Sequence, residues 1–346
     1  MKTILVILDG VSEERIAELD GKTPLEYANT PTLDKIVKYG SYEKKKFYPD
    51  DSNPDSLNCI LTMLGVKMIP KNRAYLEALA AGIEVDPSEV AFRCNLISIK
   101  DGKLESFNGR GLSAAEMEAA ARKVSKRDSL RFYHISNYRN IIVVKKSNIT
   151  SIMEDMPPHE HIGEPVDRLL KCIRDIEVLN RFAEENRFAF NNVEYMFYPW
   201  GLSEVIKLPT YYELHNKSCS CICNAEIVKG IAKAMNIDTP LLRNSTGDVD
   251  TDLKEKAAAV LRELKSHDVV IAHINGTDEV SHRKDLFGKI GFIEKIDREF
   301  LSTIYEQVKD NVKIIIAADH QTSSITGKHE KGFVDYIVSN HYEGMN

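Results

Sequence analysis

The chain has 346 residues, of which 43% are hydrophobic and 28% are charged, and its mean hydropathy is -0.30. This composition is typical of a soluble globular protein and excludes a disordered, collagen-like or membrane protein. The 46 Lys and Arg residues stand against 52 Asp and Glu, which leaves a formal net charge of -6. We therefore expect no nucleic-acid partner, and an anionic ligand must be met by a local group of cations.

The six cysteines form no CxxC pair and follow no secretory signal, since the apolar run Thr3 to Leu8 is too short for one. No stretch is long enough to span a membrane. We expect reduced thiols and a cytoplasmic location. Cys219, Cys221 and Cys223 alternate, and we interpret them as packing residues rather than as a soft metal site.

Hydrophobic periodicity predicts alternating strands and helices. The strands are continuous apolar runs, which is typical of a sheet covered on both faces, and the helices have apolar residues three and four apart. Such alternation predicts an α/β fold with a largely parallel central sheet flanked by helices. In chain order these elements are a strand at 3–8, helices at 32–39 and 252–265, a strand at 269–274, a helix at 289–309 and a strand at 312–317.

The middle of the chain, from about Ser88 to Asn192, has a different pattern. It contains short possible strands at 91–99 and 140–144, a polar helix after Ser113 and a Pro-Pro break. We predict an inserted, smaller α+β domain at 88–192, so that 1–87 and 193–346 form the core.

Ionisable residues follow each of the three predicted core strands. In parallel sheets, ligands gather at the carboxyl ends of the strands. Singly, these residues have ordinary interpretations, such as an Asp-Gly turn or a helical ion pair, but their convergence from three strand ends indicates a site. They are Asp9 after the first strand, Asp278 and His282 beyond the second, and Asp319 and His320 after the third.

Carboxylate oxygens mixed with imidazoles form a typical site for a borderline divalent metal. His329, nine residues after His320, adds an imidazole from the next loop. Because clustered carboxylates repel one another without cations, we infer two divalent ions. We expect Mn²⁺ or Zn²⁺, with Mg²⁺ and Co²⁺ as alternatives.

A metal pair indicates transfer at a phosphoryl or related group and requires a nucleophile nearby. Ser56 is the candidate, in a loop before the apolar helix-like run Cys59 to Leu64. Its alternative role is that of a helix N-cap.

Several motifs in fixed order carry a resemblance to a known family. They are ILDG at 7–10, KTPLEYANTPTLD at 22–34, LEA at 76–78, VAFRCN at 90–95, YR at 138–139, PH at 158–159, VKGI at 228–231, TDE at 277–279 with His282, IEKID at 293–297 and DH at 319–320. From Met1 to about Lys331 the chain resembles the cofactor-independent phosphoglycerate mutases of the archaeal type, within the alkaline phosphatase superfamily.

This resemblance implies an alkaline phosphatase-like core and a glycolytic isomerase that acts on a small phosphorylated substrate. Its serine takes the phosphoryl group from phosphoglycerate as a phosphoserine and returns it to the neighbouring hydroxyl. It implies that Asp9, Ser56, Asp319 and His320 surround one metal, that Asp278, His282 and His329 hold the other, and that Arg93, Arg110, Arg139 and Lys229 bind the substrate. The oligomeric state stays open.

The chain departs from the family pattern in its cations. The arginine-rich stretch expected before Gly109-Arg110 reads Leu104 to Asn108, and Leu57 follows the serine where the family has an acidic residue. With fewer arginines to retain the glycerate, water could intercept the phosphoserine. A metal-dependent phosphatase or phosphodiesterase acting on another small phosphate ester is therefore the alternative function, and a non-catalytic metal-binding relative is a third.

Overall fold

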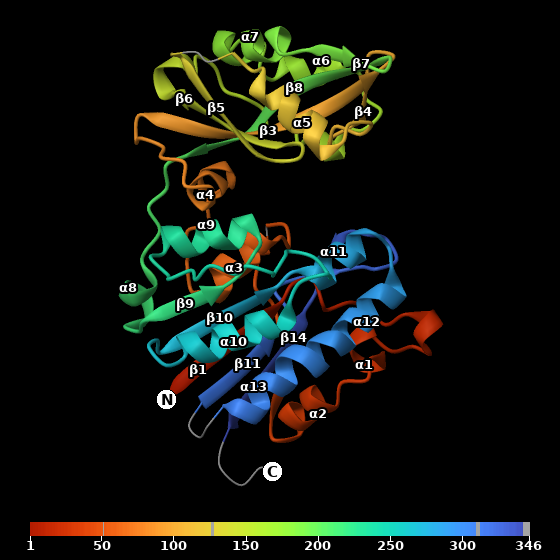
Figure 1. The fold of residues 1–346 in the computed structure, drawn as a ribbon, viewed down its shortest axis with the longest axis vertical. Helices are drawn as coiled ribbons and strands as arrows, with labels where there is room; N and C mark the ends of the chain where they lie inside the picture. The colour runs from red at the N-terminus through yellow and green to blue at the C-terminus, as the bar shows by residue number, and fades with distance from the viewer. Residues whose placement is uncertain (51, 126–127, 309–311, 342–346) are drawn as a thin grey trace. The chain divides into compact units, whose positions relative to one another are not determined.

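The computed structural model describes residues 1–50, 52–125, 128–308 and 312–341. The chain divides into two compact units (Figure 1). Met1–Ile69 and Leu208–Asn346 form the first unit, and Pro70–Lys207 forms the second. Lys309, the last residue of the predicted helix 289–309, lies outside the described residues.

The first unit is built on a six-stranded sheet with the strand order β2-β14-β11-β1-β10-β9. β9, β10, β1 and β11 are parallel, β14 pairs antiparallel with β11, and β2 at the edge pairs antiparallel with β14. The predicted largely parallel sheet is thus confirmed. The strands are β1 (Lys2–Leu8), β2 (Gly40–Lys45), β9 (Cys219–Ile222), β10 (Val269–Ile274), β11 (Val312–Ala317) and β14 (Val334–His341), and β12 (Gln321–Thr322) pairs separately with β13 (His329–Glu330).

The register of this sheet brings three strand ends to one edge. Ile7 lies opposite His273 on β10 and opposite Ala317 on β11. Because these three strands are parallel, the residues that follow them leave the sheet at the same edge.

Helices cover the sheet of the first unit. Figure 1 shows α2, α10, α12 and α13 over one face, where Phe292 and Phe300 pack in a core with Ile4 and Val6 of β1. The predicted helix 289–309 is observed as α12 and α13 joined by a π-helical turn, η4. The helices are η1 (Ala17–Leu19), α1 (Pro24–Tyr27), α2 (Pro31–Lys38), α3 (Ser56–Met63), α8 (Tyr211–His215), α9 (Glu226–Ala234), α10 (Leu253–Glu263), α11 (Gly276–His282), α12 (Leu286–Ile296), η4 (Asp297–Leu301) and α13 (Ser302–Gln307).

The second unit is α+β, as predicted, with an antiparallel sheet in the order β5-β6-β3-β8-β7 and β4 paired to β3. Its strands are β3 (Glu89–Lys100), β4 (Lys103–Ser106), β5 (Leu130–Ser136), β6 (Arg139–Lys145), β7 (Phe188–Phe190) and β8 (Val193–Glu204). Its helices are α4 (Ala74–Ala80), α5 (Ala114–Arg122), η2 (Lys146–Asn148), η3 (Pro158–Glu160), α6 (Val166–Lys171) and α7 (Glu177–Glu185). The predicted polar helix after Ser113 is α5, which Ser113 caps by accepting a hydrogen bond from the Glu116 backbone.

The second unit extends beyond the predicted bounds 88–192 on both sides. β8 lies between β3 and β7 and so belongs inside this sheet. On the other side, Ala74 and Ala78 of α4 pack with Ala91 of β3. None of the helices in the described ranges is both long and apolar enough to cross a membrane.

Candidate metal centre

The loop after β1 begins the site. The backbone N–H of Asp9 donates to the Ile274 carbonyl at 3.0 Å, and that of Gly10 donates to Asp319 Oδ1 at 3.1 Å. Gly10 has φ +61°, and a Cβ there would lie 2.5 Å from Thr322 Oγ1. Glycine is therefore required both for the turn and for the close approach of the chain to this loop.

Asp9, Asp319 and His320 form one group of candidate metal ligands, with ligand atoms within 4.8 Å of one another. All three are buried. His320 Nε2 lies 3.2 Å from Asp9 Oδ1 and 3.5 Å from Asp319 Oδ2. Ser56 Oγ lies 3.3 Å from the same nitrogen, so the predicted nucleophile is adjacent to this group.

Ser56 is the first residue of α3, and the alternative interpretation of this serine as an N-cap is wrong. The N-cap is Asp55, whose carboxylate accepts a hydrogen bond from the Asn58 backbone at 2.9 Å. The Ser56 hydroxyl is therefore available at the start of the helix, where backbone N–H groups favour an anion.

Asp278, His320 and His329 form a second group of candidate ligands. Asp278 and His282 lie one turn apart on α11, with His282 Nε2 3.2 Å from Asp278 Oδ2. His329, on β13, places Nε2 3.4 Å from Asp278 Oδ1 and 3.1 Å from His282 Nε2. His320 thus lies within reach of both groups.

Burial and mutual charge shift the ionisation of these ligands. Burial and the Asp9 carboxylate raise the pKa of Asp319 to about 6. Burial lowers the pKa of His320, but the carboxylates of Asp319 and Asp9 outweigh it and raise the pKa to about 10. The hydrogen bond to Asp278 raises the pKa of His282 to about 9. The imidazolium form of each histidine therefore offsets carboxylate charge that a metal would otherwise offset.

The residues fit divalent ions. Asp9 Oδ1 and Asp319 Oδ2 are buried without a hydrogen bond of good geometry. Buried carboxylate oxygens without hydrogen bonds destabilise the folded protein unless a cation binds them. Carboxylates with imidazoles are also the donor set that borderline metals such as Mn²⁺ and Zn²⁺ accept.

His273, the penultimate residue of β10, is a further buried residue of the site. Its Nε2 lies 3.1 Å from Asp9 Oδ2, whereas His320 contacts the other oxygen of this carboxylate, Oδ1. The sequence shows His273 at a strand end, but a lone buried histidine there gives no indication of which carboxylate it contacts.

A second, oppositely charged cluster lies within the second unit. Arg93 on β3 stacks 4.2 Å over the Trp200 ring and places Nε 3.0 Å from Glu77 Oε2. Arg73 Nε lies 2.8 Å from Glu77 Oε1. The positive charge of Arg139 also acts on both Glu77 and Arg93. Burial and Arg73 lower the pKa of Arg93 to about 10. Three arginines around one carboxylate can accept an anion.

Arg110 and Lys229 are the other predicted substrate-binding residues. Arg110 is exposed in the loop after β4, where its carbonyl accepts a hydrogen bond from Tyr195 Oη at 3.0 Å. Lys229, on α9 of the first unit, is close enough to Cys223 and Lys256 for their charges to interact. Of the predicted set, Arg93, Arg110 and Arg139 thus belong to the second unit and Lys229 to the first.

Sequence reasoning missed Arg73 and Glu77 of the arginine cluster. Their spacing of four residues at the start of α4 was the available signal, because it aligns both side chains on one helical face.

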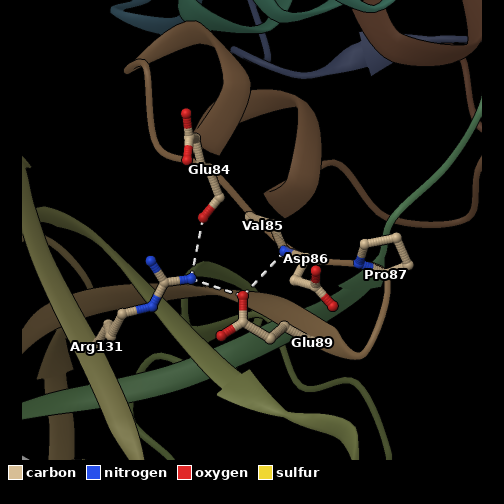
Figure 2. Close-up of a pocket in the computed structure, with 6 residues that line it drawn as sticks. All are labelled: Glu84, Val85, Asp86, Pro87, Glu89 and Arg131. Carbon is tan, nitrogen blue, oxygen red and sulfur yellow. Dashed lines mark hydrogen bonds and ion pairs between the residues drawn. The ribbon is translucent and has the colours of Figure 1, made fainter.

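Figure 2 shows a surface pocket of the second unit. It is lined by Glu84, Val85, Asp86, Pro87, Glu89 and Arg131. Arg131 donates to Glu89 Oε2 at 2.6 Å and to the Glu84 carbonyl at 3.0 Å, as the dashed lines show. Its charge is therefore already paired, and none of the predicted site residues lines this pocket.

Comparison with known proteins gives the family. A family model described as the Metalloenzyme superfamily matches residues 1–343, so the chain belongs to this superfamily, and this membership implies divalent-metal binding. Among its relatives, the 2,3-bisphosphoglycerate-independent phosphoglycerate mutase of Methanopyrus kandleri is 28% identical, with 95% of this chain and 85% of that protein covered. Mutase 1 of Methanocaldococcus jannaschii is 29% identical, with 97% and 88% covered.

Solved structures share the fold. The PH0037 protein from Pyrococcus horikoshii has a TM-score of 0.78 at 23% identity, with 98% of this chain and 87% of that chain covered. The cofactor-independent phosphoglycerate mutase from Thermoplasma acidophilum has a TM-score of 0.61 at 19% identity, with 99% and 90% covered. The predicted fold class is thus confirmed.

Proposed function

We propose that this member of the metalloenzyme superfamily interconverts 2- and 3-phosphoglycerate through a phosphoserine at Ser56. One observation carries the proposal: the Ser56 hydroxyl, free of any capping role, lies 3.3 Å from His320 Nε2, within the group formed by Asp9 and Asp319. The relatives that the chain matches over nearly its whole length bear the name of this activity.

Two divalent ions, Mn²⁺ or Zn²⁺ before Mg²⁺ or Co²⁺, complete the proposed site. Asp9, Ser56, Asp319 and His320 would hold one ion, and Asp278, His282 and His329 would hold the other. When bound, these ions would lower the pKa of the serine hydroxyl and offset the charge of the phosphoryl group. The buried oxygens of Asp9 and Asp319 that lack a hydrogen bond of good geometry support this assignment.

The reaction uses Ser56 twice. Ser56 Oγ forms a bond to phosphorus as the bond from phosphorus to the glycerate oxygen breaks, and the serine proton passes to that oxygen. The glycerate then presents its other hydroxyl, whose oxygen attacks the phosphoserine, and Ser56 regains a proton. The N-terminus of α3 stabilises the phosphoryl group in both steps, because its first backbone N–H groups have no partner inside the helix.

Arg93 and Arg139 are the proposed ligands of the substrate's anionic groups, together with Arg73. Arginine suits this role because its planar guanidinium pairs with a carboxylate or phosphate through two parallel hydrogen bonds. Glu77 and Trp200 hold Arg93 in a single orientation before any substrate binds. Arg110 and Lys229 remain proposed substrate ligands on the resemblance alone.

The test is to follow 2-phosphoglycerate by ³¹P NMR with the purified protein and Mn²⁺. We expect 3-phosphoglycerate to appear, and we expect EDTA to stop its formation. Release of inorganic phosphate without 3-phosphoglycerate would instead identify a phosphatase. The glycolytic reaction and the six free cysteines also lead us to propose a cytoplasmic location.

A further inference from the structure

Thr322, on β12, contacts both groups of candidate ligands. It is fully buried and lies two residues after His320. Its hydroxyl donates to Asp278 Oδ1 at 2.7 Å and lies 3.1 Å from His320 Nδ1. Across the short β12–β13 ladder, Thr322 also pairs with His329. One threonine therefore contacts a carboxylate of one group and the imidazole that both groups reach.

The direction of these hydrogen bonds fixes the tautomer of His320. A hydroxyl has one hydrogen, and an ionised carboxylate can only accept, so Thr322 donates to Asp278. The hydroxyl oxygen must then accept from His320 Nδ1–H. With the hydrogen on Nδ1, the neutral ring carries its lone pair on Nε2, the nitrogen that lies 3.3 Å from Ser56 Oγ.

The surrounding chain holds Thr322 in this position. Its backbone N–H donates to the Ser12 carbonyl at 3.2 Å. Its carbonyl accepts from Lys289 Nζ at 2.8 Å, and the same ammonium is paired with Glu13 at 2.9 Å inside the core. Gly10 leaves the space that the hydroxyl fills, since a Cβ there would overlap it.

We propose that Thr322 is a positioning residue that couples the two metal sites by orienting Asp278 and His320 through one hydroxyl. The inference rests on the proposed function, since it concerns the ligands of the ions that this function needs. Loss of the hydroxyl should weaken both sites together, although Thr322 itself is not proposed as a ligand.

Three variants and isothermal titration with Mn²⁺ test the role. Thr322→Val keeps the shape but removes the hydroxyl, Thr322→Ser restores it, and Thr251→Val is the matched control. Thr251 is also buried and uses its hydroxyl to accept from the Thr246 backbone at 3.1 Å. We expect the wild type to bind two ions, Thr322→Val to bind both about tenfold or more weakly, and the serine and control variants to resemble the wild type.

A measurement on the wild type covers the case in which Thr322→Val fails to fold. In protein labelled with ¹⁵N-histidine and loaded with diamagnetic Zn²⁺, His320 should carry its hydrogen on Nδ1. A hydrogen on Nε2 would overturn the proposal. So would wild-type affinity at either site in a folded Thr322→Val protein.

The two proposals fail separately. If the wild type binds two Mn²⁺ but does not interconvert the phosphoglycerates, the proposed function is wrong, and the binding data still decide the role of Thr322. If the wild type binds no Mn²⁺, both proposals are wrong.

Discussion

The two units carry clusters of opposite charge that are held in different ways. In the first unit, three buried aspartates contact histidines, and one carboxylate oxygen each of Asp9 and Asp319 lacks a hydrogen bond of good geometry. In the second unit, Glu77 pairs with Arg73 and Arg93, and Arg93 also stacks on Trp200. The carboxylates of the first cluster need cations to offset their charge. In the second cluster, Glu77 orders the arginines and leaves an excess of positive charge.

This difference supports the proposal that chemistry and recognition reside in separate units. A group of buried carboxylates is stable only with bound cations or protons, so its geometry depends on what it binds. An arginine held between a carboxylate and an aromatic ring is oriented in advance and loses little freedom when an anion arrives. Substitutions in the first cluster should therefore change catalysis and metal binding, and those in the second should change substrate affinity.

The largest effect is expected for Ser56→Ala. Removing the nucleophile should lower the rate of interconversion by more than about 10³-fold, because no other group can form the covalent intermediate. Mn²⁺ affinity should fall only modestly, since aspartates and His320 remain. Steady-state rates and Mn²⁺ titration measure both quantities, with the exposed Ser266→Ala as control. A Ser56→Ala protein with unchanged activity would exclude Ser56 as the nucleophile.

Arg93→Ala should have the next largest effect. Loss of a charged hydrogen-bonding partner of the substrate should lower kcat/KM by about 10- to 100-fold, chiefly through KM. Arg93→Lys should recover little, because lysine cannot form the paired hydrogen bonds or stack in the same way on Trp200.

Arg131→Ala is the matched control for Arg93→Ala. Arg131 lies in the same unit and is also paired with a glutamate, Glu89, but at the pocket of Figure 2 rather than in the arginine cluster. If both variants lowered kcat/KM equally, or if Arg93→Ala lowered kcat alone, recognition would not reside in this cluster.

The first cluster also predicts the pH dependence of the metal-free protein. The pKa values of His282 and His320 are raised to about 9 and about 10, so the folded state holds their protons more tightly than the unfolded state. Their contribution to stability is full below the ordinary histidine pKa of about 6.5 and is lost as the pH rises through 9 to 10. The melting temperature of EDTA-treated protein should fall over this range.

Bound ions should remove this dependence, because they need neutral imidazoles. At pH 7.5, metal binding should release about two protons, one from each histidine. Titration calorimetry with Mn²⁺ in buffers of different ionisation enthalpy measures this number. Binding without proton release would show that the ions do not displace protons from His282 and His320.

The sequence predicted the elements of the first unit better than the bounds of the second. Continuous apolar runs identify β1, β10 and β11, and the parallel order then places Asp9 and Asp319 at one sheet edge. The bounds 88–192 leave out β8, because a strand in the middle of an antiparallel sheet is recognised only by its partners β3 and β7.

Side-chain contacts across the chain were the least predictable part of the site. Thr322 looks like an ordinary threonine, and its role depends on Asp278, which is 44 residues away in sequence. The role of Glu77 likewise depends on its ion pair with Arg93. Motif spacing identifies residues that chemistry requires, but it does not identify the residues that orient them, since many side chains could fill that role.

The smallest effect is expected for Arg110→Ala, which tests whether the exposed loop after β4 takes part in recognition. Arg110 follows the stretch Leu104 to Asn108, where the resemblance to the mutases predicts several arginines and this chain has none. If it helps to retain the glycerate between the two steps, its loss should lower interconversion by about tenfold or less and leave phosphate release unchanged, because the phosphoserine does not depend on it. The ratio of 3-phosphoglycerate to inorganic phosphate in ³¹P spectra measures this partition, and Arg168→Ala, another exposed arginine of the same unit, is the control.

An equal fall in both products would mean that Arg110 acts on the phosphoryl group itself. An unchanged ratio and rate would leave recognition to the arginine cluster around Glu77, and the contrast between the two units would then rest on Arg73, Arg93 and Arg139 alone.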